Sequence, residues 1–121
     1  MSLRPAFQPD QWLGRKLSLT IDRPLGTPHP RDPDMIYPIN SGYVPGTRAG
    51  DGHPVDAYVI DLNEPVDACQ ARCIAILHRR DDVEDKLVCV VAEGDWTDAA
   101  IYEKTRFQEQ FFDTILIRDV G

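Results

Sequence analysis

The sequence predicts a small, mainly β (α+β) protein, in which a closed barrel of five or more strands carries one helix near the C-terminus. Segments with strand patterns follow one another at close spacing, and no strand–helix–strand alternation is present. All ten prolines lie in the first 65 residues, which predicts irregular loops at the front and regular elements at the back. The 121 residues suffice for one hydrophobic core, so we expect 1–121 to be a single domain.

Alternating apolar and polar residues locate the expected strands. Leu17, Leu19 and Ile21 alternate with polar neighbours, which is the two-residue period of a half-buried strand over 15–22. The proline-rich segment 24–38 is expected to be a long loop, and loops of this length within a compact domain are often functional. By the same criteria, further strands are expected at 36–43, 56–62, 72–78, 86–92 and 114–118.

One helix is expected over 97–112. Thr97 is a favourable N-cap residue, and Asp98 places a negative charge in the first turn, where the helix dipole favours it. The expected apolar face consists of Ala100, Ile101, Phe107, Phe111 and Phe112. Lys104 and Gln108 interrupt that face, so we expect this helix to be only partly buried.

The charge balance excludes two classes of partner. Acidic residues outnumber basic residues 20 to 13, which gives a formal net charge of −7. Nonspecific binding to nucleic acid or to an anionic membrane needs a basic surface, so we expect neither partner. No apolar run reaches the ~18 residues that span a bilayer, and the N-terminus has no signal-peptide core. The three cysteines lack metal-binding spacing, which favours a reduced, cytoplasmic protein.

The densest group of reactive side chains lies in segment 51–56. Asp51, His53 and Asp56 place two carboxylates and an imidazole within six residues. A glycine and a proline in the same segment allow a tight turn that directs several side chains to one point, as a hard divalent cation requires. The alternative is an ordinary turn in which the aspartate and glycine only satisfy the backbone.

A second acidic group, over 81–86, lies between two expected buried strands. Its adjacent like charges repel one another, so a bound cation or Lys86 would stabilise them. The alternative is a solvated acidic turn. Both acidic groups lie at strand ends, which neighbouring strands of a small barrel could bring within coordination distance. The loops also carry three arginines that could grip phosphate or lie on the surface, Arg23, Arg31 and Arg48.

Together, these segments resemble the soluble family I inorganic pyrophosphatases. Residues 51–56, Asp-Gly-His-Pro-Val-Asp, resemble the signature Asp-Gly-Asp-Pro-x-Asp, and 37–43, Tyr-Pro-Ile-Asn-Ser-Gly-Tyr, resemble Tyr-Pro-x-Asn-Tyr-Gly-Tyr. Further similar segments occur in the family's order at 21–24, 74–77, 81–86, 87–91 and 107–112. The resemblance covers about 15–112. It implies a barrel related to the OB-fold and a single pyrophosphatase-like domain over 1–121.

The resemblance also implies a reaction and a site. Pyrophosphate would be hydrolysed to two phosphates with several magnesium ions, by a protein that assembles into a homo-oligomer. The metal ligands would be Asp51, Asp56, Asp81 and Glu84. The substrate-binding residues would be Asp22, Arg31 and Lys86. The catalytic positions would be Asp51 and His53. The acidic turn is shorter than in the family, which leaves open whether Glu84 or Asp85 occupies one acidic position.

Several residues depart from the family pattern. His53 replaces the middle aspartate of the signature, and a neutral imidazole makes manganese, cobalt or zinc candidates beside magnesium. Ser41, Phe111 and Phe112 replace tyrosine, tyrosine and lysine, which removes phosphate contacts. We therefore expect a divergent, metal-dependent pyrophosphatase that acts on pyrophosphate or a related phosphoanhydride. The alternative is a non-catalytic relative that keeps the barrel as a binding or assembly module.

Overall fold

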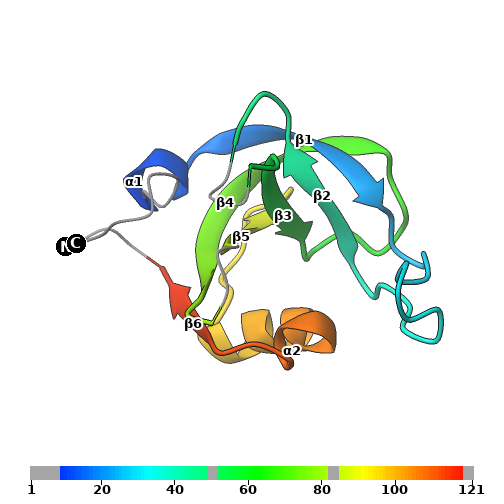
Figure 1. Cartoon of the computed structure of the whole chain (residues 1–121). Helices are drawn as coiled ribbons and strands as arrows, with labels where there is room; N and C mark the ends of the chain where they lie inside the picture. Colours follow the sequence, from blue (N-terminus) through cyan, green and yellow to red (C-terminus); the bar gives the residue numbers. More distant parts are fainter. Residues whose placement is uncertain (1–8, 49–51, 82–84, 119–121) are drawn as a thin grey trace.

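The computed structural model describes residues 9–48, 52–81 and 85–118. Its elements are α1 (Pro9–Trp12), β1 (Lys16–Arg23), β2 (Asn40–Val44), β3 (Val55–Val59), β4 (Ala68–Arg79), β5 (Asp85–Val90), α2 (Asp98–Glu109) and β6 (Thr114–Ile117). The six strands of this part of the chain form one sheet in the order β1-β2-β3-β5-β4-β6. Additional pairing of β1 with β4 closes the first five into a barrel (Figure 1). The predicted closed barrel with a C-terminal helix is therefore confirmed.

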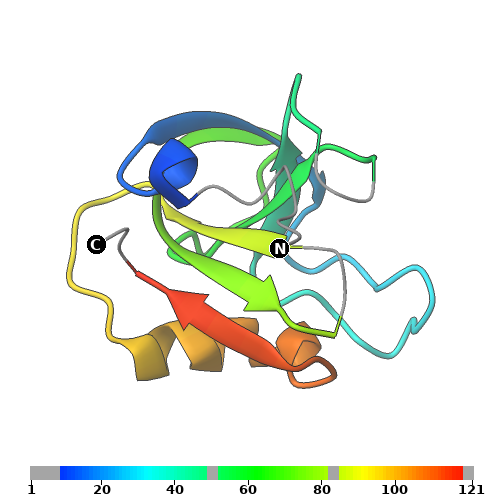
Figure 2. The same cartoon turned by 60° about the vertical axis from the view of Figure 1, so that its left-hand side comes forward.

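Strand β4 organises the sheet because it pairs with three other strands. Its first part is antiparallel to β1, its last part is antiparallel to β6, and β5 lies antiparallel along it. Figure 2 shows β6 lying beside the second half of β4, with α2 below both. Strands β3 and β5 are parallel neighbours, with Asp56 opposite Lys86. The start of β3 and the start of β5 therefore lie side by side at one end of the barrel.

Two hydrophobic cores lie on opposite faces of the sheet. Ala57 and Val59 of β3 point into the barrel, whereas Tyr58 packs on the outer face together with Ile60 and Ile101 of α2. Alternate residues of β3 therefore pack into different cores, as expected for a strand buried on both faces. Burial of each large apolar side chain stabilises the fold by roughly 1.5–3 kcal/mol, so both faces of the sheet contribute to holding it closed.

Helix α2 begins as predicted and ends earlier than predicted. Thr97 is the N-cap, and its hydroxyl accepts a hydrogen bond from Ala100 N at 3.1 Å. The expected apolar face is partly wrong, because the buried residues of this helix are Ile101, Thr105 and Glu109. The helix ends before Phe111, and the side chain of Phe111 is 67% exposed.

Buried Asn40 sets the boundary between the long loop and β2. Its Oδ1 accepts hydrogen bonds from Leu25 N at 2.9 Å and Val66 N at 3.3 Å, and its Nδ2 donates to Glu64 O at 2.9 Å. The strand therefore begins at Asn40, four residues later than expected. The loop before it is closed by the bridge between Pro28 and Ile36 and by backbone hydrogen bonds such as that from Tyr37 N to Thr27 O at 2.9 Å. No helix in the described ranges has the length and apolar character needed to cross a membrane.

Candidate functional site

Asp56 on β3 and Lys86 on β5 are the two predicted site residues in direct contact. Lys86 Nζ donates to Asp56 Oδ2 at 3.0 Å. The Lys86 side chain is 9% exposed and the Asp56 side chain 28% exposed, so the ion pair sits at the edge of the outer core. Because the two residues are register partners on parallel strands, the sheet itself fixes their approach.

Aromatic residues surround this ion pair. Lys86 Nζ lies 5.6 Å from the centre of the Tyr58 ring, within the range of a cation–π contact. Burial raises the pKa of Tyr37, while the positive charges of Lys86 and Arg23 act in the opposite direction and Asp22 and Asp56 raise it further. Tyr37 thus lies within electrostatic range of these four charges. We call the following five charged and aromatic residues the Asp56–Lys86 cluster: Asp22, Arg23, Tyr37, Asp56 and Lys86.

A buried polar network lies behind this cluster and escaped sequence reasoning. Glu109 accepts hydrogen bonds from Arg79 Nε at 3.0 Å, from Arg79 Nη2 at 2.6 Å and from the Tyr58 hydroxyl at 2.7 Å. Burial raises the pKa of Tyr58 well above its usual value, and the neighbouring Glu109 carboxylate raises it further. The spacing of Ile101, Thr105 and Glu109 at every fourth position is the signal that could have indicated that Glu109 lies on the buried side of α2.

Contacts between aromatic rings beside this network join the long loop to α2. The Phe107 ring meets Tyr37 edge to face at 5.3 Å and Tyr58 at 5.8 Å between ring centres. The His29 ring lies nearly parallel to that of Tyr37, with 5.9 Å between centres. The loop between β1 and β2 is therefore held against the C-terminal half of the helix (Figure 1).

The acidic turn after β4 is only partly described. Asp81 lies at the same end of the barrel as Asp56, and its Oδ2 accepts a hydrogen bond from Asp113 N at 3.1 Å. Asp85 Oδ1 lies 2.8 Å from His78 Nδ1. The predicted ligands Asp51 and Glu84 lie outside the described residues.

The other predicted residues within the described ranges lie in loops or near the end of a strand. His53 is exposed in the turn that enters β3, and Gly52 before it has φ +86°, a left-handed conformation that glycine adopts without strain. Arg31 is exposed in the loop between β1 and β2. Asp22 is exposed near the end of β1 and contributes to the charge around Tyr37.

The carboxylates at this end of the barrel are suitable metal ligands, but the described residues do not form a complete ligand set. Carboxylates such as those of Asp56 and Asp81 are the oxygen ligands that hard divalent cations take. Within residues 9–48, 52–81 and 85–118, however, no group of three or more potential ligands gathers at one point. A cation at this end of the barrel would therefore need ligands from 49–51 or 82–84, or an exchange of the Asp56–Lys86 contact.

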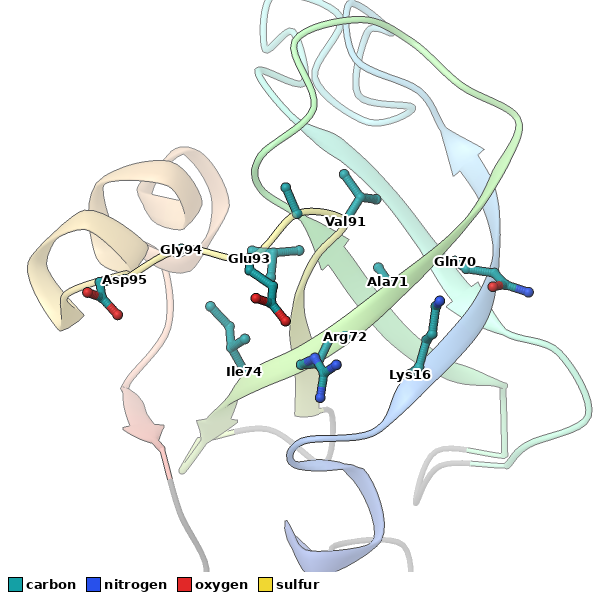
Figure 3. Close-up of a pocket in the computed structure, with 11 residues that line it drawn as sticks. Lys16, Gln70, Ala71, Arg72, Ile74, Val91, Glu93, Gly94 and Asp95 are labelled. Atoms are coloured by element: carbon teal, nitrogen blue, oxygen red, sulfur yellow. The ribbon is translucent and has the colours of Figure 1, made fainter.

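Two of the cavities lined by residues of the described ranges lie beside the barrel. One of about 610 Å³ lies between the long loop and the end of α2, and Arg31 is among its lining residues. The other, of about 630 Å³, lies where β5 ends, with Lys16 and Arg72 on one side and Glu93 on the other (Figure 3). The second cavity contains no predicted site residue and lies at the opposite end of β5 from Lys86.

A closed barrel with a helix over its outer face is a fold that this chain shares with solved structures of inorganic pyrophosphatases. The structure aligns with that of an inorganic pyrophosphatase from Ehrlichia chaffeensis over 99% of this chain and 93% of that chain, with a TM-score of 0.67 and 18% sequence identity. The alignment with an inorganic pyrophosphatase from Coxiella burnetii covers 82% of this chain and 78% of that chain, with a TM-score of 0.62 and 20% sequence identity. These structural neighbours define the class of fold.

The family model for inorganic pyrophosphatase matches residues 19–116. The chain therefore belongs to the inorganic pyrophosphatase family, as its motifs predicted. An inorganic pyrophosphatase from Xylella fastidiosa (strain 9a5c) is 38% identical over 77 residues, which are 60% of this chain and 40% of that protein. One from Ralstonia nicotianae is 44% identical over 55 residues, 46% of this chain and 28% of that protein. The matches thus span less than half the length of these relatives.

Proposed function

We propose that this chain is a divergent, metal-dependent hydrolase that cleaves inorganic pyrophosphate to phosphate. The observation that carries the proposal is the Lys86–Asp56 contact of 3.0 Å, formed by two motif residues on adjacent parallel strands of a pyrophosphatase-type barrel. A lysine ammonium beside a carboxylate provides one group for an anionic phosphate and one for a cation.

The proposed metal ligands are Asp51, Asp56, Asp81 and Glu84, with Asp85 as the alternative to Glu84. Asp56 and Asp81 lie at the same end of the barrel, which supports this set. A divalent ion bound there would supply an activated water and neutralise charge on the leaving phosphate. Magnesium follows from the family, whereas His53 keeps manganese, cobalt and zinc as candidates.

The proposed roles of the remaining residues follow from their charge. Lys86 would hold a phosphate oxygen once the carboxylate of Asp56 turns to a cation, and its 9% exposure would strengthen that contact by limiting competition from water. Asp22 and Arg31 would lie at the rim of the substrate site. Asp51 and His53 would flank the attacking water.

Phosphate release from pyrophosphate, measured with magnesium, manganese, cobalt or zinc, tests this function. We expect activity with at least one metal and a loss of about 100-fold or more in Asp56→Asn, because the substitution removes a ligand charge. Asp95→Asn is the matched control, because Asp95 is an exposed aspartate that lines the cavity at the opposite end of β5.

Pyrophosphate turnover that is equal in Asp56→Asn and in wild type would contradict the proposed site. No phosphate release with any metal would favour the non-catalytic relative, a binding or assembly module that keeps the barrel.

We further propose a homo-oligomeric, cytoplasmic, single-domain protein that uses a small phosphate-containing substrate and binds neither nucleic acid nor membrane. Light scattering of the purified chain tests the assembly.

A further inference from the structure

The cavity between the long loop and the end of α2 is larger than pyrophosphate needs. Its volume of about 610 Å³ lies in the range of sites that hold organic ligands of drug-like size. Aromatic and cationic side chains line it, among them His29, Arg31, Phe111 and Phe112. The Phe111 ring is 67% exposed, so it presents an apolar face to whatever enters the cavity.

The walls of this cavity are held in place by contacts from behind. The Phe112 ring lies 3.6 Å from the guanidinium carbon of Arg79, and two hydrogen bonds to Glu109 fix that guanidinium. On the loop side, His29 stacks on Tyr37, and its Nδ1 accepts a hydrogen bond from Arg31 N at 3.1 Å. Because both walls are anchored, a planar ring could enter without a large ordering cost.

Side-chain contacts link the cavity to the Asp56–Lys86 cluster. Gln108 lines the cavity and accepts a hydrogen bond from the Tyr58 hydroxyl at 3.3 Å, while the Tyr58 ring faces Lys86. Tyr37 belongs to the cluster, and its ring stacks on that of His29, which lines the cavity. Arg31, a proposed substrate-binding residue, lines the cavity itself, so a ligand with its phosphates at Arg31 could place an attached aromatic group beside Phe111.

From this arrangement we propose that the substrate class includes phosphoanhydrides that carry an aromatic base, represented by a nucleoside diphosphate. The inference rests on the proposed function and extends it. Water adds to the terminal phosphorus and the bond from that phosphorus to the bridging oxygen breaks. The products are a nucleoside monophosphate, inorganic phosphate and a proton, so water is the co-reactant, and a divalent ion held by the proposed ligands would neutralise charge on the leaving group.

Calorimetric binding of AMP to the full chain in the presence of magnesium tests the base site separately from hydrolysis. We expect wild type to bind AMP more tightly than inorganic phosphate, and Phe111→Ala to bind AMP about 10-fold more weakly, the scale of one lost base–aromatic stack. Tyr102→Ala is the matched control, because Tyr102 is an exposed aromatic residue of α2 outside the cavity lining. It should bind AMP like wild type.

Three binding results would overturn the inference: AMP bound no more tightly than phosphate, equal loss in both variants, or AMP affinity unchanged in Phe111→Ala. If light scattering shows that Phe111→Ala also forms a smaller assembly than wild type, the Phe111 side chain belongs to a contact between subunits. Parallel assays with ADP and pyrophosphate separate the two proposals. Release of phosphate from pyrophosphate but not from ADP overturns the substrate class alone. Release from neither, with AMP still bound, overturns the proposed hydrolysis and supports the base site.

Discussion

At the scale of single residues, the buried pair Arg79–Glu109 departs furthest from what sequence patterns suggest. Its side chains are 1% and 4% exposed, whereas arginine and glutamate are rarely buried without a partner. Burial of either charge alone would be costly, so the two hydrogen bonds between them and the added donor from Tyr58 are what make the arrangement stable. The pair thereby fixes the end of α2 against β3 and β4.

Glu109→Gln should lower the free energy of unfolding by about 3–5 kcal/mol, because it removes the carboxylate charge that faces the buried Arg79 guanidinium. Urea unfolding followed by tryptophan fluorescence measures the change. Asp113→Asn is the control, because it removes the exposed pair Arg80–Asp113 and should change stability little. The joint variant Arg79→Met with Glu109→Leu should recover much of the loss. Equal destabilisation by Glu109→Gln and Asp113→Asn would contradict the importance of burial.

His53 carries the second prediction at this scale. If the chain hydrolyses pyrophosphate, His53→Asp should raise activity with magnesium relative to activity with manganese by roughly tenfold, the scale on which neighbours of a metal change its binding. The reason is that a carboxylate adds a charged oxygen donor, which magnesium prefers. His53→Asn, which removes the imidazole without adding charge, is the control. Identical metal profiles in the wild type and in both active variants would show that His53 does not govern metal choice.

At the scale of elements, the contact between β1 and β2 depends on Gly42. A Cβ atom at this position would lie 2.8 Å from Ile21 Cα and closer still to the Thr20 carbonyl oxygen. Both are backbone atoms, so no side-chain rotation relieves the clash. Gly42→Ala should therefore cost about 1–3 kcal/mol or more of unfolding free energy. Gly94→Ala, where nothing lies within 4 Å, should stay within about 0.5 kcal/mol of wild type in the same urea titration.

The sequence predicted the positions of strands that have one buried face, but it did not predict the residues at which the strands begin and end. The alternation of Leu17, Leu19 and Ile21 located β1, because only one face of that strand meets the core. Strand β4 was expected over 72–78 but begins at Ala68, since its first residues pair with β1 and that partner lies some 50 residues away along the chain. The four-residue helix α1 was missed because so short a segment has no readable period.

At the scale of the whole molecule, the sequence predicted that two motifs lie at the ends of neighbouring strands, but it did not predict the Asp56–Lys86 contact or its surroundings. Asp56 and Lys86 belong to these two motifs, and the pairing of β3 with β5 brings them together. The ring contacts of Tyr37, Tyr58 and Phe107 join β3, the long loop and α2, so no local pattern reports them. The cavity beside Phe111 arises in the same way, from the packing of a loop against a helix end.

The stability of the whole fold should fall as pH rises above about 9. Unfolded tyrosine loses its proton near pH 10, whereas burial and the Glu109 carboxylate raise the pKa of Tyr58 in the folded state well above that value. The unfolded state therefore binds fewer protons at alkaline pH, and the free energy of unfolding declines with increasing pH.

For each buried group with a raised pKa, the free energy of unfolding should decline by at most about 1.4 kcal/mol per pH unit. The buried thiol of Cys89 adds to the decline, because its hydrogen bond to Cys73 and its burial raise its pKa. Urea unfolding at pH values from 8 to about 11 measures the decline. Tyr58→Phe should reduce the slope, although it also lowers stability at every pH by removing a hydrogen bond to Glu109. The exposed Tyr102 is the control, and Tyr102→Phe should leave the slope as in wild type. A slope in Tyr58→Phe equal to that of wild type would show that the Tyr58 hydroxyl does not limit stability at alkaline pH.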